Sequence, residues 1–137
     1  MNRRSIPCCV FVLLVLVGCS DHGTEPPSGG GGSGTTTVSY AADVQPIWTA
    51  NCTVCHGAGG NAGLDLRMPD SRTHLVDVDA VNWPGKLVVA DESDQSVLYL
   101  KLMGAPGVGD RMPQGGVLGT GALETVRRWI VEGALDN

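Results

Sequence analysis

The residues of this sequence with the clearest potential for chemistry form the pentapeptide Cys52-Thr53-Val54-Cys55-His56. Two thiols separated by two residues, with a histidine directly after the second, are typical of covalent haem attachment. The thiols can form thioether bonds to two vinyl groups of the ring, and the histidine then presents an imidazole nitrogen to the iron. The spacing therefore predicts one covalent haem c, attached at Cys52 and Cys55 and ligated by His56.

A Cys-x-x-Cys pair has three other common uses. A redox pair of the thioredoxin type lies near a βαβ pattern, and the sequence contains no evident strand-helix-strand run. A structural zinc site needs four ligands, whereas the remaining cysteines, Cys8, Cys9 and Cys19, all lie at the extreme N-terminus. A structural disulfide has no need of a histidine after the second cysteine. Haem attachment is the interpretation that uses the whole motif.

Four side chains could fill the second axial position of the iron: Met68, His74, Met103 and Met112. Thioether and imidazole groups both suit haem iron, so residue type alone does not decide. Met103 ends an apolar segment and is expected to fill space in the core. Met112 lies in a loop with a proline and glycines, which restrict the backbone and allow close approach to a flat ring. We predict Met112 as the distal ligand, with Met68 and His74 as alternatives.

The N-terminal region predicts export and a lipid anchor. Residues 1–18 combine two arginines with an apolar run that is too short to span a bilayer, as in a signal peptide. The segment from Leu16 to Cys19 resembles a bacterial lipobox, in which the cysteine receives the lipid and becomes the mature N-terminus. Residues 19–37 then form a flexible tether rich in Gly, Ser, Thr and Pro. We expect a periplasmic, membrane-anchored protein, and Ser20 favours the outer membrane.

The predicted mature chain is acidic. It carries seven Lys and Arg residues against fourteen Asp and Glu residues, a formal net charge of −7. Such a surface repels the phosphates of nucleic acid, which excludes that class of partner. It favours redox proteins with a basic docking patch, and the association is expected to weaken as the salt concentration rises.

Residues 38–137 are enough for one small domain, and their apolar periodicity predicts an all-α fold with long loops. Because aromatic residues are scarce, a buried haem is expected to complete the core, and the haem-free chain is expected to fold poorly. Four helices are predicted. The first is capped by Asp43 and ends near Cys52, the second covers 71–78 and is capped by Asp70, and the third is capped by Ser93 and ended by Gly104. The fourth runs from Thr120 to Gly133, and its expected buried face consists of Leu123, Val126, Trp129 or Ile130, and Ala134.

The order of these motifs resembles the class I cytochrome c family, in particular a bacterial branch often found as planctomycete-type cytochrome domains. The matching segments are Val44-Gln45-Pro46-Ile47, Cys52 to Gly57, Gly63 to Leu66, Arg111 to Pro113, and Val126 to Ala134. The resemblance extends over residues 40–137 and implies a small helical domain wrapped around one covalent haem. It departs from the family pattern in having a second Arg-Met-Pro, at Arg67 to Pro69.

By this resemblance, Cys52 and Cys55 attach the haem, and His56 and Met112 are its axial ligands. Iron with both axial positions filled has no site for a substrate, so the expected function is single-electron transfer between redox partners rather than catalysis. The alternative is a haem module that senses or binds small ligands or peroxide, with an open or displaceable distal ligand.

Overall fold

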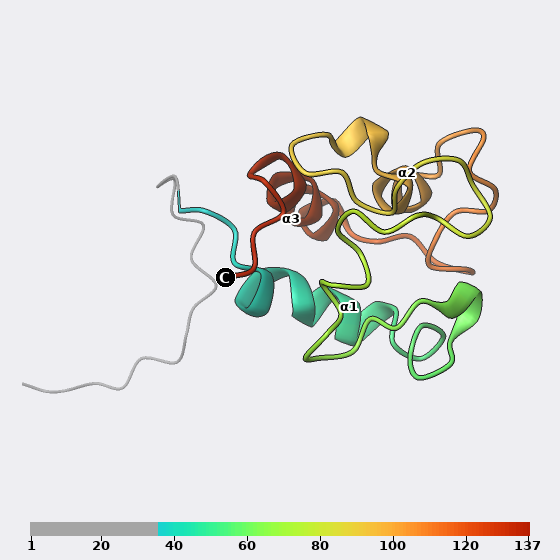
Figure 1. Ribbon diagram of the computed structural model, residues 1–137, viewed down its shortest axis with the longest axis horizontal. Helices are drawn as coiled ribbons and strands as arrows, with labels where there is room; N and C mark the ends of the chain where they lie inside the picture. The colour runs from blue at the N-terminus through green and yellow to red at the C-terminus, as the bar shows by residue number, and fades with distance from the viewer. Residues whose placement is uncertain (1–35) are drawn as a thin grey trace, which may run out of the picture. The chain divides into compact units, whose positions relative to one another are not determined.

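Three α-helices and three short helical turns form the part of the chain that the computed structural model describes, residues 36–137 (Figure 1). The elements are η1 (Tyr40–Val44), α1 (Gln45–Asn51), η2 (Asn61–Gly63), η3 (Ser93–Gln95), α2 (Val97–Met103) and α3 (Thr120–Val131). Among these residues the only β pairing consists of two isolated bridges, which confirms the all-α prediction for this part of the chain. The predicted signal peptide, Cys19 and nearly all of the tether lie outside the described residues.

Within residues 36–137, no helix combines the length and the apolar character needed to cross a membrane. The helices are short, and long loops connect them. These loops, together with the end of α1, position the site described below.

The first helical segment begins one turn earlier than predicted, and Asp43 is not its N-cap. Ser39 is the cap: its Oγ accepts a hydrogen bond from Ala42 N–H at 3.2 Å, and the Asp43 carboxylate accepts one from Ser39 N–H at 2.9 Å. Asp43 thus acts from inside the first turn, where the helix dipole favours a negative charge. The segment from Tyr40 to Val44 is a wide π-turn, and Pro46 is the second residue of α1, which follows it. A wider turn leaves room for the proline ring beside the preceding carbonyls.

The prediction of a helix over 71–78 is wrong. This segment forms turns that begin at Asp70, whose carbonyl accepts a hydrogen bond from His74 N–H at 3.3 Å. The backbone leaves helical geometry at Asp77, which has a φ of 63°. Val76 forms an isolated bridge with Val88 instead. The β-branched residues of the segment have low helix propensity, so a pairing with a distant segment is enough to displace the helix.

The third predicted helix is present with a different start. Ser93 begins the 3₁₀ turn η3, and α2 itself begins after Ser96. Ser96 is buried, and its hydroxyl donates to the Glu92 carbonyl at 2.8 Å instead of capping the helix. The predicted end at Gly104 is confirmed, because this residue adopts the left-handed conformation with a φ of 70°.

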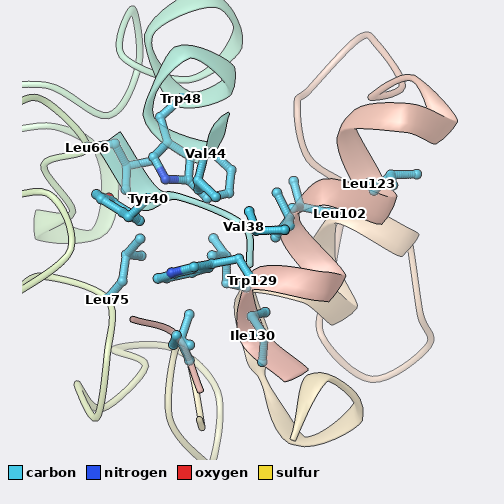
Figure 2. Close-up of a cluster of buried hydrophobic side chains, with 14 of the residues drawn as sticks. Val38, Tyr40, Val44, Trp48, Leu66, Leu75, Leu102, Leu123, Trp129 and Ile130 are labelled. Carbon is cyan, nitrogen blue, oxygen red and sulfur yellow. The ribbon is translucent and has the colours of Figure 1, made fainter. Parts of the chain in front are cut away.

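The core lies where α3 meets the first helical segment (Figure 2). Trp129 of α3 is fully buried, and its ring centroid lies 5.0 Å from that of Tyr40. Figure 2 shows Trp48 and Val44 on the same side of the Trp129 ring as Tyr40. The buried face predicted for the last helix is confirmed, and its members are Leu123, Val126, Trp129, Ile130 and Ala134.

A chain of hydrogen bonds crosses this core. Tyr40 Oη lies 2.8 Å from Ser71 Oγ, which donates to the side-chain carbonyl of Gln45. The amide nitrogen of Gln45 in turn donates to the Leu66 carbonyl at 2.9 Å. All three side chains are buried, so each bond satisfies a polar group that would otherwise lack a partner away from water. The network ties the first helical segment to the loop that follows the Cys-x-x-Cys-His motif.

The two ends of the described chain are held side by side (Figure 1). Val38 N–H donates to the Glu132 carboxylate at 2.6 Å, and Tyr40 N–H donates to the side chain of Asn137 at 2.9 Å. Ala41 N–H also donates to the Asn137 carbonyl at 3.0 Å. The Val38 amide, assisted by Arg128, lowers the pKa of Glu132 from its ordinary value.

Replacing Ser71 with Ala should destabilise the protein. The change leaves Tyr40 Oη and the Gln45 side-chain carbonyl without their shared buried partner, which should lower the free energy of unfolding by about 1–3 kcal/mol. Denaturant titration of the purified protein measures this change. Thr73→Ala is the matched control, because the Thr73 hydroxyl is exposed and bonds only to the Asp70 carbonyl nearby. Equal denaturant concentrations at the unfolding midpoint of the two variants would contradict a stabilising role for the network.

Candidate functional site

A cavity of about 340 Å³ lies among the end of α1, helix α2 and the loops on either side of α2. Its size is within the range of pockets that bind small molecules and cofactors, about 300–1,000 Å³. Its lining is largely apolar and includes Trp48, Leu64, Leu66, Leu87, Leu98 and Leu102. Three of the predicted site residues also line it, namely Cys52, His56 and Met112.

The end of α1 positions the Cys-x-x-Cys-His motif. Helix α1 ends at Asn51, and Cys52 N–H still donates to the Trp48 carbonyl at 2.8 Å. The backbone then turns, with His56 N–H donating to the Cys52 carbonyl at 2.8 Å. This turn brings Cys52 and His56 to the cavity wall, while Cys55 is exposed and outside the lining.

The two thiols are free, and their setting does not suit a redox pair. Burial raises the pKa of the Cys52 thiol to about 11, and the neighbouring Cys55 adds to this effect. A catalytic dithiol instead needs a lowered thiol pKa, since the thiolate is the reactive form. Among the described residues, no group of three or more His, Cys, Asp and Glu side chains could hold a metal ion. The arrangement therefore favours neither thiol-disulfide exchange nor a structural zinc site.

The orientation of His56 leaves one ring nitrogen free for a metal. His56 Nδ1 lies 3.2 Å from the Asn61 carbonyl oxygen. Because a carbonyl oxygen can only accept, Nδ1 carries the proton in this bond, and Nε2 keeps its lone pair. A hydrogen bond from the other ring nitrogen also fixes the ring plane of a metal-bound histidine. The loop approaches closely here, because a Cβ at Gly60 would lie 2.8 Å from the Cys55 carbonyl oxygen.

Only one of the candidate distal ligands lines the cavity within the described residues. Met112 is half-buried against the core, and its side chain is part of the cavity wall. Met68 is 56% exposed and lies outside the lining. His74 is also exposed and outside it, with Nδ1 2.8 Å from the Asp65 carbonyl oxygen. Met103 does not fill the core as expected, since it is 47% exposed at the end of α2.

The residues around the cavity fit a covalently attached haem. They supply two free thiols, an imidazole with Nε2 available, and a thioether from a separate loop. The apolar lining suits the faces of a porphyrin. When bound, haem would supply a one-electron iron couple, held by Cys52 and Cys55 and ligated by His56 and Met112.

Sequence reasoning missed three residues at this site. Asn61 acts through its backbone carbonyl, so no side-chain pattern could reveal it. Lys101 and Trp83 both line the cavity, and Lys101 Nζ lies 5.0 Å from the centre of a Trp83 ring. The position of Lys101 in the last turn before Gly104 was a usable signal, since cations are favoured at helix C-termini.

Comparison with known proteins supports the fold. No protein-family model matches the sequence, and no curated protein matches it. Among solved structures, the chain is similar to part of a hydrazine synthase of Kuenenia stuttgartiensis. The two share 21% sequence identity with a TM-score of 0.50, over 71% of this chain and 16% of the synthase chain. At this identity the likeness concerns the fold alone.

The two thiols of the haem-free protein should differ in reactivity. Cys55 is exposed, whereas the raised pKa of Cys52 keeps its thiol protonated near neutral pH. Alkylation of Cys52 by iodoacetamide should therefore be slow at pH 7 and accelerate as the pH rises toward about 11. Mass spectrometry of timed samples measures both sites. Equal, fast labelling of the two at pH 7 would show that Cys52 is not buried without haem.

Proposed function

We propose that this chain is a monohaem c-type cytochrome of the class I kind, which carries single electrons between redox partners. The observation that carries the proposal is the convergence of Cys52, His56 and Met112 on one apolar cavity, with Cys55 exposed next to His56 in the chain. These residues come from two segments more than fifty positions apart. One segment would supply the thiols and the imidazole that hold a haem, and the other would supply the thioether.

Each residue has a distinct role in this proposal. Cys52 and Cys55 hold the ring through thioether bonds, which prevents its loss. His56 binds the iron through Nε2, because the bond from Nδ1 to Asn61 directs Nε2 away from the loop. Met112 would supply a second protein ligand to the iron. Both positions are then occupied by protein, so we propose a carrier rather than an enzyme.

The surroundings of the cavity would tune the reduction potential. A methionine ligand raises the potential of haem iron relative to a second histidine. An apolar lining disfavours the more highly charged oxidised site and acts in the same direction. The protein would therefore accept electrons from a low-potential donor and pass them to a high-potential acceptor.

We also propose that the mature protein is exported and lipid-anchored through Cys19, on the periplasmic side of a bacterial membrane. Its acidic composition favours redox partners with a basic docking patch and excludes nucleic acid. The tether at 19–37 would join the domain beside Asn137, because residues 38–41 are bonded there.

Replacing Met112 with Ala should remove the distal ligand. The oxidised wild type is expected to show a low-spin haem spectrum with the weak charge-transfer band of a thioether-iron bond. In the variant this band should be absent, and the reduction potential of the iron should be lower. Optical spectra and a redox titration measure both effects.

Met68→Ala is the matched control, since Met68 lies in a second Arg-Met-Pro sequence, which is outside the cavity lining. This variant should keep the wild-type spectrum. Loss of the band in Met68→Ala, and not in Met112→Ala, would assign the distal ligand to Met68. A high-spin wild-type spectrum would favour the ligand-binding alternative, and a protein without haem would refute the proposal.

The acidic surface should control reaction with small redox reagents. Reduction by a cationic metal complex should slow as the salt concentration rises, while reduction by an anionic complex of similar potential should accelerate. Stopped-flow measurements over a range of ionic strength give both slopes. Slopes of the reverse sign would show that the exposed region around the haem is basic despite the overall charge.

A further inference from the structure

The loop over 104–119, which carries Met112 and is called the methionine loop below, is hydrogen-bonded to the end of α2 at several points. Met112 N–H donates to the Lys101 carbonyl at 3.0 Å. The ammonium group of Lys101 donates back to the loop, to the Val108 carbonyl at 2.6 Å and the Asp110 carbonyl at 3.4 Å. Arg111 Nε donates to the Leu102 carbonyl at 3.0 Å. The last turn of α2 and the loop thus satisfy each other's backbone groups.

Lys101 joins this loop to a second loop that also lines the cavity. Its Nζ lies 5.0 Å from the centre of a Trp83 ring, within the range of a cation–π contact. Trp83 and Lys101 both line the cavity. Lys101 therefore contacts its own helix, the methionine loop and the loop that carries Trp83.

Trp83 also lies directly against the methionine loop. A Cβ at Gly109 would be 2.5 Å from Cζ2 of Trp83, and Gly109 has a φ of 72°, so only glycine fits there. The Trp83 loop is itself closed at its base, where Ala80 N–H donates to the Gly85 carbonyl at 3.0 Å. The ring thus packs on the backbone of the methionine loop three residues before Met112.

We propose that Lys101 and Trp83 form a clasp that holds the methionine loop against the cavity, so that Met112 stays on the iron and external ligands are kept out. The inference rests on the proposed function and makes Lys101 and Trp83 positioning residues. On this fold, the closed clasp would distinguish an electron carrier from a haem module that binds external ligands. Opening the clasp would turn the first into the second.

The physical basis is an equilibrium between a closed and an open loop. An external ligand binds iron only when Met112 has left, so its apparent affinity is its intrinsic affinity multiplied by the open fraction. Without the Lys101 ammonium, two loop carbonyls lose a charged donor and the Trp83 ring loses its cation. Charge-assisted hydrogen bonds are among the stronger ones, so their loss raises the open fraction.

Lys101→Met tests the clasp, because it removes the ammonium and keeps a long apolar stem. In the ferric haem-loaded protein, imidazole should bind the variant about tenfold more tightly than the wild type, equivalent to about 1.4 kcal/mol. The Met112 amide should exchange its hydrogen faster by a similar factor. Spectroscopic titration and hydrogen exchange measured by mass spectrometry report the two effects independently.

Lys86→Met is the matched control. It removes the same charge, but Lys86 pairs with Asp79 at 2.9 Å and lies outside the cavity lining. Its imidazole affinity should stay within about twofold of the wild type, as for ordinary surface changes. Trp83→Leu is a second test that does not depend on how well Lys101→Met folds, and it should shift imidazole binding in the same direction as that variant.

Unchanged imidazole affinity and unchanged exchange at Met112 in both Lys101→Met and Trp83→Leu would overturn the clasp. An equal rise in Lys86→Met would also overturn it, because the effect would then be one of net charge. Failure of the proposed function looks different. It would appear in the wild type itself, as a missing haem or a missing thioether band.

Discussion

The site depends above all on where α1 ends. The packing of Trp48 and Tyr40 with Trp129 in the core fixes the direction of α1, and the hydrogen bond from Cys52 to the Trp48 carbonyl carries that direction into the motif. A thiol and an imidazole reach one cavity only because the chain turns immediately after this bond. The buried network from Tyr40 through Gln45 to the Leu66 carbonyl holds the next loop beside the same turn. Core packing and site geometry are therefore coupled along the first helical segment.

The sequence predicted well those elements whose signals are local. The apolar periodicity of the last helix predicted its buried face, since Trp129 and its neighbours recur at helical spacing. Gly104 ends α2 as expected. The helix over 71–78 failed because a bridge to the distant Val88 outweighs weak local preference there. The helix starts at Ser39 and Ser96 lie about one turn from the predicted positions, because several polar residues near each start can bond the backbone equally well.

For the site, spacing predicted Cys52, Cys55 and His56, and the surrounding proline and glycines favoured Met112 over Met68, but the sequence could not show which of the two Arg-Met-Pro sequences lines the cavity. That choice depends on contacts between residues far apart in the chain. Met112 is bonded to the end of α2 and faces the cavity, whereas Met68 lies in an exposed turn. Lys101 and Trp83 were missed for the same reason, since their partners are backbone groups of a separate loop. The lipid anchor at Cys19 and the redox partners remain predictions from the sequence.

The hydrogen bonds that join residues 38–41 to Asn137 and Glu132 have a consequence for modularity. A domain whose incoming and outgoing ends lie side by side can be placed inside a longer polypeptide with little disturbance of its interior. In this domain these bonds lie at the start of the first helical segment, and the cysteines follow its other end. Segments joined at residue 38 or at Asn137 would therefore lie away from the end of α1 that carries Cys52.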